Sequence, residues 1–452
     1  MNRSFLQKYN TQGPRYTSYP TVPYWDETPP TEANWLELVR ESFRVSNQSE
    51  GISLYVHLPY CESLCTYCGC NTRITVNHAV ESPYVETLLQ EWQLYLDALP
   101  EKPRIKEFHF GGGTPTFFSP FNLHRLAKGI LDGTEPVAHP DFSLEGHPNN
   151  TSPDHLQTLF DLGFRRVSFG IQDFDPRVQE VVNRIQTFEQ VKFITGAARA
   201  IGYTSINYDL IYGLPLQKLD SVQGTLDKVT LLRPDRIALY SYAHVPWIKP
   251  GQRKFTELDL PTGEEKRALY ELGRDFLEKE GYVEIGMDHF ALPSEALSRA
   301  AAAGMMHRNF MGYTPEHTRL CIGLGVSAIG DAWTGFLQNH KRVEDYLAAV
   351  NAGHLPIYRG HVHTAEDLLL RQHILNIMCR HATQWDAQAM DPAIEAAIAR
   401  LQPMVEDGLV TIHTDGLQVT DSGRPFVRNI CMALDARLAE KVPAEVIFST
   451  TV

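Results

Sequence analysis

Through the middle of the chain, short apolar runs alternate with longer amphipathic stretches. Runs rich in β-branched and aromatic residues predict strands, and stretches with apolar residues every three or four positions predict helices. The predicted strands are 52–58, 105–110, 142–145, 166–172, 205–212 and 236–244, separated by helices such as 84–99, 153–162 and 188–201. Six strand-then-helix units predict an α/β protein with an open or partial parallel (β/α)6 barrel.

The two ends of the chain differ from this middle region. The first 45 residues show little helical or strand periodicity and are rich in aromatic residues, Pro and Gly, so we expect an extended arm packed on the main domain. After about residue 358, helix-like segments at 365–379 and 392–407 precede a short apolar hairpin at 409–419. We therefore divide the chain into an arm at 1–45, a barrel at 46–360 and a small, mostly helical domain at 361–452.

Helices followed by a hairpin also describe a winged helix, which would indicate DNA binding. The charge balance argues against DNA binding, because the chain has 41 Lys and Arg but 54 Asp and Glu, which gives a net charge of −13. An acidic surface repels nucleic acid and acidic membranes, and the segment carries no basic stripe. We expect this domain to support or cap the barrel, and a polyanionic substrate to need a local basic pocket.

The first residues contain no apolar signal-peptide core, and no later stretch reaches the roughly 20 apolar residues that a bilayer span needs. We therefore expect a cytoplasmic protein with no membrane span.

Four of the seven cysteines fall within ten residues, as Cys61, Cys65, Cys68 and Cys70. In a reducing compartment such crowding indicates a metal centre and not disulfides. Three thiolates on a four-iron cubane leave one iron open to an outside ligand. A zinc site is the alternative, but zinc motifs usually pair two knuckles, and the sequence holds no second pair. We predict a 4Fe–4S cluster on Cys61, Cys65 and Cys68, and leave the role of Cys70 open.

Glycines and polar residues follow successive strands of the predicted barrel. Residues 111–116 read GGGTPT, where residues without a Cβ would let a ligand approach backbone amides. Glu145, Gln172 and Asp209 each close or follow an apolar run, and strand C-terminal ends point into a barrel mouth. Carboxylates there suit ribose hydroxyls or an amino acid, and Arg184 suits a carboxylate. Each alone could be a satisfied core residue, but their recurrence at one end favours a ligand site.

His289, His307 and Arg308 lie beside aromatic residues further along the chain. A lone histidine is more often a satisfied core residue than a catalyst, so these three are weaker candidates for substrate contact.

The Cx3CxxC string, with an aromatic residue before its third cysteine, resembles the radical S-adenosylmethionine (SAM) superfamily. Strings along nearly the whole chain are similar to those of the oxygen-independent coproporphyrinogen III oxidases (coproporphyrinogen dehydrogenases) within it. They are YNTQGPRYTSYPT, YVHLPYCESLCTYCGCN, GGGTPT, GIQDFDPRVQEVVNR, DLIYGLP, YAHVP, GMDHFALP, HRNFMGYT, GLGVSAIG and RNICMALD. This coverage is far more specific than the cysteine motif alone.

The resemblance implies a radical SAM barrel and anaerobic oxidative decarboxylation of two propionates of coproporphyrinogen III to the vinyl groups of protoporphyrinogen IX, in haem biosynthesis. It implies that SAM chelates the open iron and that its reductive cleavage gives a 5′-deoxyadenosyl radical. It also implies a monomer that takes electrons from a donor such as flavodoxin or ferredoxin.

Two SAM molecules bound side by side are a further implication. The first would contact Tyr55, Gly112 and Glu145. The second would contact Tyr67, Gly113, Thr114, Gln172, Arg184, Asp209, Ala243 and Ile329. This chain departs from relatives at two places: Gly-His-Pro follows Glu145 where some have Val-Asp-Pro, and Met311 stands where a Gln can contact the second SAM.

Two relatives within the superfamily are alternatives, a haem-degrading methyltransferase and a haem chaperone. The chaperone class typically lacks both the CxC formed by Cys68 and Cys70 and the PRYTSYPT arm, and this chain has both. The oxidase is therefore the function that the sequence favours.

Overall fold

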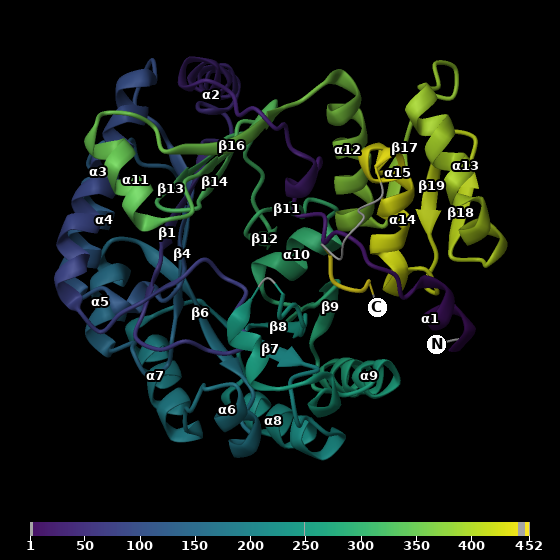
Figure 1. Cartoon of the computed structure of the whole chain (residues 1–452), viewed down its shortest axis with the longest axis horizontal. Coiled ribbons are helices and arrows are strands. Elements are labelled where there is room, and N and C mark those ends of the chain that lie inside the picture. The colour runs from purple at the N-terminus through teal and green to yellow at the C-terminus, as the bar shows by residue number, and fades with distance from the viewer. Residues whose placement is uncertain (1–2, 248, 442–447, 452) are drawn as a thin grey trace.

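The computed structural model describes residues 3–247, 249–441 and 448–451. A large twisted sheet with helices on its outer face forms the main body (Figure 1). Six of its strands pair in parallel, each with the next along the chain. They are β1 (Ile52–Leu58), β4 (Ile105–Gly112), β5 (Asp141–Gly146), β6 (Phe164–Gln172), β7 (Ser205–Tyr212) and β8 (Arg236–Ser241). This confirms the predicted α/β class and partial six-unit barrel.

The helices that connect these strands cover the outer face of the sheet (Figure 1). They are α3 (Glu81–Ala98), α4 (Pro120–Leu131), α5 (Pro153–Asp161), α6 (Pro176–Val181), α7 (Phe188–Ile201), α8 (Leu219–Leu232) and α9 (Gly263–Lys279). Phe108 and Phe110 of β4 are fully buried in the main apolar core, which also holds Trp92 of α3. Because side chains alternate along a strand, Glu107 and His109 face the opposite side, the interior of the barrel.

Short strands extend the sheet beyond the six predicted ones, giving the order β16-β15-β14-β13-β1-β4-β5-β6-β7-β8-β10-β9 among the described residues. β13 (Cys321–Leu324) pairs in parallel with the free edge of β1. The others, which pair antiparallel, are β14 (Ile329–Asp331), β15 (Gly335–Asn339), β16 (Ile357–Val362), β10 (His289–Ala291) and β9 (Val283–Gly286). Strands of three to six residues are too short to show a clear period in sequence.

The expectation that the first 45 residues lack helical periodicity was wrong. They contain α1 (Arg3–Tyr9) and most of the 15-residue α2 (Glu32–Ser46). Trp35, Val39 and Phe43 of α2 recur every four residues and are fully buried, and Thr31 caps the helix by accepting a hydrogen bond from the amide of Asn34. The aromatic and Pro-rich segment before α2 concealed this pattern.

The C-terminal region has a separate apolar core. The predicted helices and hairpin are confirmed as α12 (Ala365–Arg380), α13 (Pro392–Glu406), β18 (Val410–His413) and β19 (Gly416–Val419). β17 (Ala382–Gln384), α14 (Val427–Leu434) and α15 (Ala436–Glu440) complete it, and residues 442–447 lie outside the described part. Tyr9 and Tyr16 of the arm share this core. The domain boundaries at 45/46 and 360/361 stay a prediction.

The remaining elements are short or lie on the periphery of the sheet. They are β2 (Tyr60–Cys61), β3 (Arg73–Ile74), α10 (Ala296–Ala302), β11 (His307–Asn309), β12 (Gly312–Thr314), α11 (Val343–Asn351) and the 3-10 turns Val22–Tyr24, His78–Val80, Pro115–Phe117, Pro250–Lys254, Glu257–Asp259 and Arg424–Phe426. No helix of the described residues is long and apolar enough to span a membrane.

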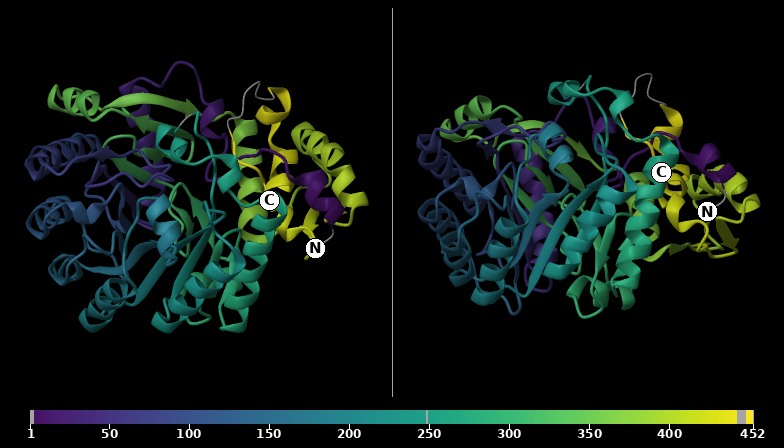
Figure 2. Two further views of the ribbon diagram at one scale, coloured as in Figure 1. Left: turned by 60° about the horizontal axis from the view of Figure 1, so that its bottom comes forward. Right: turned by 90° about the horizontal axis from the view of Figure 1, so that it is seen from below.

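Both ends of the chain meet on the C-terminal region, where the arm lies beside it in two views (Figure 2). Gln12 forms an antiparallel bridge with Thr450. Arg428 of α14 donates to the carbonyls of Pro14 at 2.9 Å and Thr450 at 2.8 Å. A buried guanidinium thus fastens the arm and the last residues to one helix.

Candidate active site

Two adjoining cavities lie where the parallel strands end. The smaller has a volume of about 270 Å³ and the larger about 990 Å³. Both are lined by the loop that follows β1, by Gly112 at the end of β4 and by Glu145 of β5. Most of the predicted site residues therefore gather at the C-terminal edge of the sheet, where barrel enzymes place their chemistry.

The thiols of Cys61, Cys65 and Cys68 all line the smaller cavity. The Cys61 Sγ lies 3.2 Å from the Thr114 hydroxyl oxygen. A hydrogen bond with Cys70 lowers the pKa of Cys68 to about 6, and burial raises the pKa of Cys61 to about 11. Because the thiolate binds metal, Cys68 is a ready ligand, and metal binding at Cys61 must release a proton.

This arrangement is compatible with a four-iron cluster. Among the described residues, no three His, Cys, Asp or Glu side chains converge closely enough to hold one metal ion. In a cubane each thiolate binds a different iron, so the sulfurs need only surround a shared space. The three thiols do border one cavity, and Arg184 places Nη1 3.6 Å from Cys65 Sγ, where its charge favours an anionic cluster.

The glycine run brings the end of β4 close to the thiol loop. A Cβ on Gly113 would lie 2.5 Å from the Pro59 carbonyl oxygen and 3.0 Å from the Cys61 sulfur. The Gly113 amide donates to the Leu58 carbonyl at 2.9 Å, and the Gly112 amide donates to the Glu145 carboxylate at 3.1 Å. Protein atoms accept hydrogen bonds from these two amides, and the missing Cβ at Gly113 lets β4 pack directly against the thiol loop.

Side chains after β6 and on β7 close the smaller cavity. Gln172 ends β6 with a φ of 68°, and its Oε1 is buried without a hydrogen-bond partner among the described residues. Arg184 Nε is likewise unpartnered, although its Nη2 donates to the Gly170 carbonyl. Buried polar atoms without partners on a cavity wall indicate a polar ligand.

Asp209 of β7 lines the same cavity and is held by two neighbours. Its carboxylate accepts hydrogen bonds from Ser168 at 3.0 Å and Asn207 at 2.8 Å. Burial, and then the nearby charge of Glu145, raise the pKa of Asp209 to about 6. The wall thus carries an oriented carboxyl group that gains from a cationic or hydroxyl-bearing ligand.

The larger cavity is lined by Tyr55, Met311 and Ile329, among others. The Tyr55 ring stacks on His109, and its hydroxyl lies 3.0 Å from His57 Nδ1. A volume near 1,000 Å³ is at the upper end of what organic-ligand pockets use, so a large organic ligand fits here.

The candidates Ala243, His289, His307 and Arg308 line neither of these cavities. Arg308 instead donates to the backbone carbonyls of Arg15 and Tyr16, so it holds the N-terminal arm.

The structure adds three residues that sequence reasoning did not place in the site. His147 and Tyr240 line the smaller cavity, and Lys249 lines the larger, where its Nζ donates to the Cys70 carbonyl at 3.2 Å. Burial, and then the charge of Arg184, lower the pKa of His147 to about 3, so it is neutral at physiological pH. His147 was visible as a departure from relatives, but Lys249 lies in a loop with no sequence signal.

Comparisons with known proteins identify the relatives of this chain. A model of the radical SAM superfamily matches residues 55–229. The oxygen-independent coproporphyrinogen III oxidase of Helicobacter pylori is 38% identical over 447 residues, covering 96% of each chain. That of Escherichia coli is 38% identical over 445 residues, covering 97% of this chain and 96% of its own. The solved structure of coproporphyrinogen III oxidase from Escherichia coli, a radical SAM enzyme, matches with a TM-score of 0.88 at 36% identity over 93% of this chain and 97% of that one.

Proposed function

Because the chain belongs to the family of oxygen-independent coproporphyrinogen III oxidases, we infer that it is a radical SAM enzyme of haem biosynthesis. It converts two propionates of coproporphyrinogen III into the vinyl groups of protoporphyrinogen IX by anaerobic oxidative decarboxylation. Its cofactors, a 4Fe–4S cluster and SAM, supply when bound a 5′-deoxyadenosyl radical that takes hydrogen from a propionate carbon. The observation that carries this inference is three thiols around one cavity, beside a second cavity that fits a large organic ligand.

Cys61, Cys65 and Cys68 are the proposed cluster ligands. The fourth thiol, Cys70, is proposed to assist, because its hydrogen bond with Cys68 favours the Cys68 thiolate. Arg184 is proposed to stabilise the negative charge of the loaded site from its position beside Cys65.

The proposed SAM contacts lie on both cavities, and Gly112 and Glu145 line both of them. Those of the first SAM, Tyr55, Gly112 and Glu145, all line the larger cavity. The smaller cavity is lined by six of the proposed contacts of the second SAM: Tyr67, Gly113, Thr114, Gln172, Arg184 and Asp209. Ile329 borders the larger cavity instead, and Ala243 borders neither, so these two are the weakest members of the second set.

The chain's own residues prepare the site before any ligand binds. Glu145 is fixed by the Gly112 amide, and Asp209 by Ser168 and Asn207. Groups held in this way pay little further ordering cost when a ligand binds.

We also propose that the protein works as a monomer in the cytoplasm, with a donor such as flavodoxin or ferredoxin supplying electrons. A reducing compartment keeps the thiols available as metal ligands.

The test is anaerobic reconstitution with iron and sulfide, followed by incubation with a reductant, SAM and coproporphyrinogen III. We expect vinyl product together with 5′-deoxyadenosine. Cys61→Ser, Cys65→Ser or Cys68→Ser should each abolish the visible absorbance of the cluster and the turnover, whereas Cys70→Ser should retain the absorbance. Haem binding without turnover would identify a chaperone, and iron retained with SAM cleavage in any of the first three variants would contradict the ligand set.

A further inference from the structure

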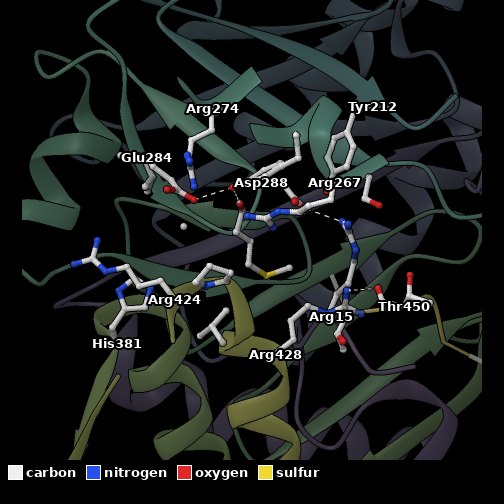
Figure 3. A pocket seen from close by; sticks show the side chains of 18 of the residues that line it. Arg15, Tyr212, Arg267, Arg274, Glu284, Asp288, His381, Arg424, Arg428 and Thr450 are labelled. Carbon is white, nitrogen blue, oxygen red and sulfur yellow. Dashed lines mark hydrogen bonds and ion pairs between the residues drawn. The ribbon is translucent and has the colours of Figure 1, made fainter. Parts of the chain in front are cut away.

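A third, basic cavity of about 150 Å³ lies between the barrel, the N-terminal arm and the C-terminal domain (Figure 3). Arginines reach it from three parts of the chain: Arg267 and Arg274 from α9, Arg424 and Arg428 from the C-terminal domain, and Arg15 from the arm. The lining holds five arginines but only three carboxylates, in a protein whose net charge is −13. Such a local excess of positive charge runs against the overall balance of the chain.

The three carboxylates are already engaged by neighbouring groups. Asp288 pairs with Arg15 at 3.0 Å, and Asp421 pairs with Arg424 at 3.3 Å. Glu284 accepts a hydrogen bond from the Tyr270 hydroxyl at 2.8 Å, and burial raises the pKa of Glu284. Of the other arginines, Arg274 pairs at 2.7 Å with Asp275, which lies outside the lining.

Two further arginines of the lining lack either a counter-charge or a hydrogen-bond acceptor. Arg428 is buried and donates only to backbone carbonyls, with no carboxylate within ion-pairing distance among the described residues. Arg267 pairs through Nε with Glu271, but its buried Nη2 has no partner among the described residues. A buried charge without a counter-charge, and a buried donor without an acceptor, are both costly.

The potential of this cavity also acts on its surroundings. Burial, and then the charge of Arg15, lower the pKa of Lys266, next to Arg267 in α9, to about 8. Burial and Arg15 also lower the pKa of Arg428 to about 10. Burial is the larger cause of both shifts, and the neighbouring charge of Arg15 adds to it.

We propose that this cavity binds a small oxyanion, of the carboxylate or phosphate type, between Arg267, Arg274 and Arg424, with Arg428 at its base. Guanidinium groups match oxyanions through paired, charge-assisted hydrogen bonds. The bound anion joins α9 to the C-terminal domain, because each contributes arginines to it.

Two sources of this anion are chemically equivalent at the cavity. One is a free anion of the cell, and the other is a propionate carboxylate of the tetrapyrrole. The Arg15 guanidinium, which lines the basic cavity, lies over the ring of Tyr240 at 5.8 Å. Because Tyr240 lines the smaller active-site cavity, the basic cavity and the smaller active-site cavity are neighbours.

Calorimetry on the reconstituted full-length protein, titrated with inorganic phosphate at constant ionic strength, tests the proposal. We expect saturable binding in the unmodified protein and a loss of about tenfold or more in affinity in Arg267→Gln and in Arg424→Gln. Arg44→Gln is the matched control, because its side chain on α2 is 55% exposed and far from the cavity lining. The Arg424 side chain is 59% exposed, so that variant keeps the test valid if Arg267→Gln folds poorly. No saturable binding, or equal binding in all variants, overturns the proposal.

Repeating the titration with coproporphyrinogen III bound distinguishes the sources. A loss of about tenfold in phosphate affinity assigns the cavity to a substrate carboxylate, and unchanged affinity assigns it to a free anion; either supports an oxyanion site. Because the readout is binding, its failure is separable from failure of the proposed oxidase activity.

Discussion

At the scale of single residues, Gly113 shows how closely the thiol loop and β4 approach each other. In Gly113→Ala the new Cβ would press on the Pro59 carbonyl and the Cys61 sulfur, at 2.5 and 3.0 Å. We expect this variant to fold but to retain less iron and to bind SAM at least about tenfold more weakly, because a displacement near 1 Å is costly at a reacting site.

Gly196→Ala in α7 is the matched control, since its Cβ would meet no atom within 4 Å. It should retain iron fully and gain about 0.5–1 kcal/mol of stability from helix propensity. Iron quantification and SAM titration decide the comparison, and equal iron retention in the two variants would show that the close approach is unimportant.

Asp209 carries a prediction about pH. Its pKa rises from an ordinary value of 3.8 to about 6 on folding. Between these pH values the folded protein holds a proton that the unfolded chain has released, so the free energy of unfolding falls as the pH rises from about 4 to about 6. The cofactor-free Asp209→Asn variant should lose this fall, of at most about 3 kcal/mol. Denaturant unfolding across that range measures it, and an unchanged slope in the variant would sink the idea.

At the scale of elements, there is a physical reason why the six parallel strands could be predicted from the sequence and the short added strands could not. Runs such as Ile52–Leu58 are long, apolar and bounded by turns, so their period and position could be predicted. β13 and β14 have only four and three residues, and they become strands through tertiary pairing, β13 with β1 and β14 with β13 and β15, not through a local pattern. α2 is a different case, because its period at Trp35, Val39 and Phe43 is readable but directly follows an aromatic, Pro-rich segment that has no period.

The packing of α2 gives a prediction at this scale. Trp35 is fully buried, and its indole donates to the Tyr95 hydroxyl at 3.0 Å. Trp35→Ala should lower the free energy of unfolding by about 3–5 kcal/mol, because it leaves a cavity and an unpaired hydroxyl. Phe193→Ala on α7, where the ring is 65% exposed, should change it by about 0.5 kcal/mol or less. Equal costs in denaturant unfolding would show that α2 is not part of the core.

At the scale of the whole molecule, Arg428 joins both chain ends to α14. Arg428→Leu would leave the carbonyl of buried Pro14, and that of exposed Thr450, without their guanidinium donor. We expect a loss of at least about 2 kcal/mol of stability and faster proteolytic cleavage within the arm. Limited proteolysis with mass spectrometry locates the cuts, with Arg44→Leu as the exposed control. Cleavage elsewhere, or at the unmodified rate, would mean that the arm is held by other contacts.

The candidate site was predictable where its residues are neighbours in sequence. The thiols and the glycine run each form a contiguous string whose spacing carries chemistry. Lys249 and Tyr240 come from the end of the barrel and reach the site only through the closure of the sheet. The arginines of the basic cavity come from three segments far apart in the chain, so no local sequence pattern predicts this cavity.

Pairing between β1 and β13 sets an order of events on the ribosome. β1 and the thiols leave the exit tunnel early, but Cys321–Leu324 follows only after more than half of the polypeptide has been made. Until then the nascent chain exposes one edge of β1, open to mispairing. Ile329, on the wall of the larger cavity, is later still. Translation therefore supplies the last residue of the smaller, thiol-lined cavity at Tyr240 and completes the larger cavity only afterwards, so the ligand of the larger cavity can be held only late in synthesis.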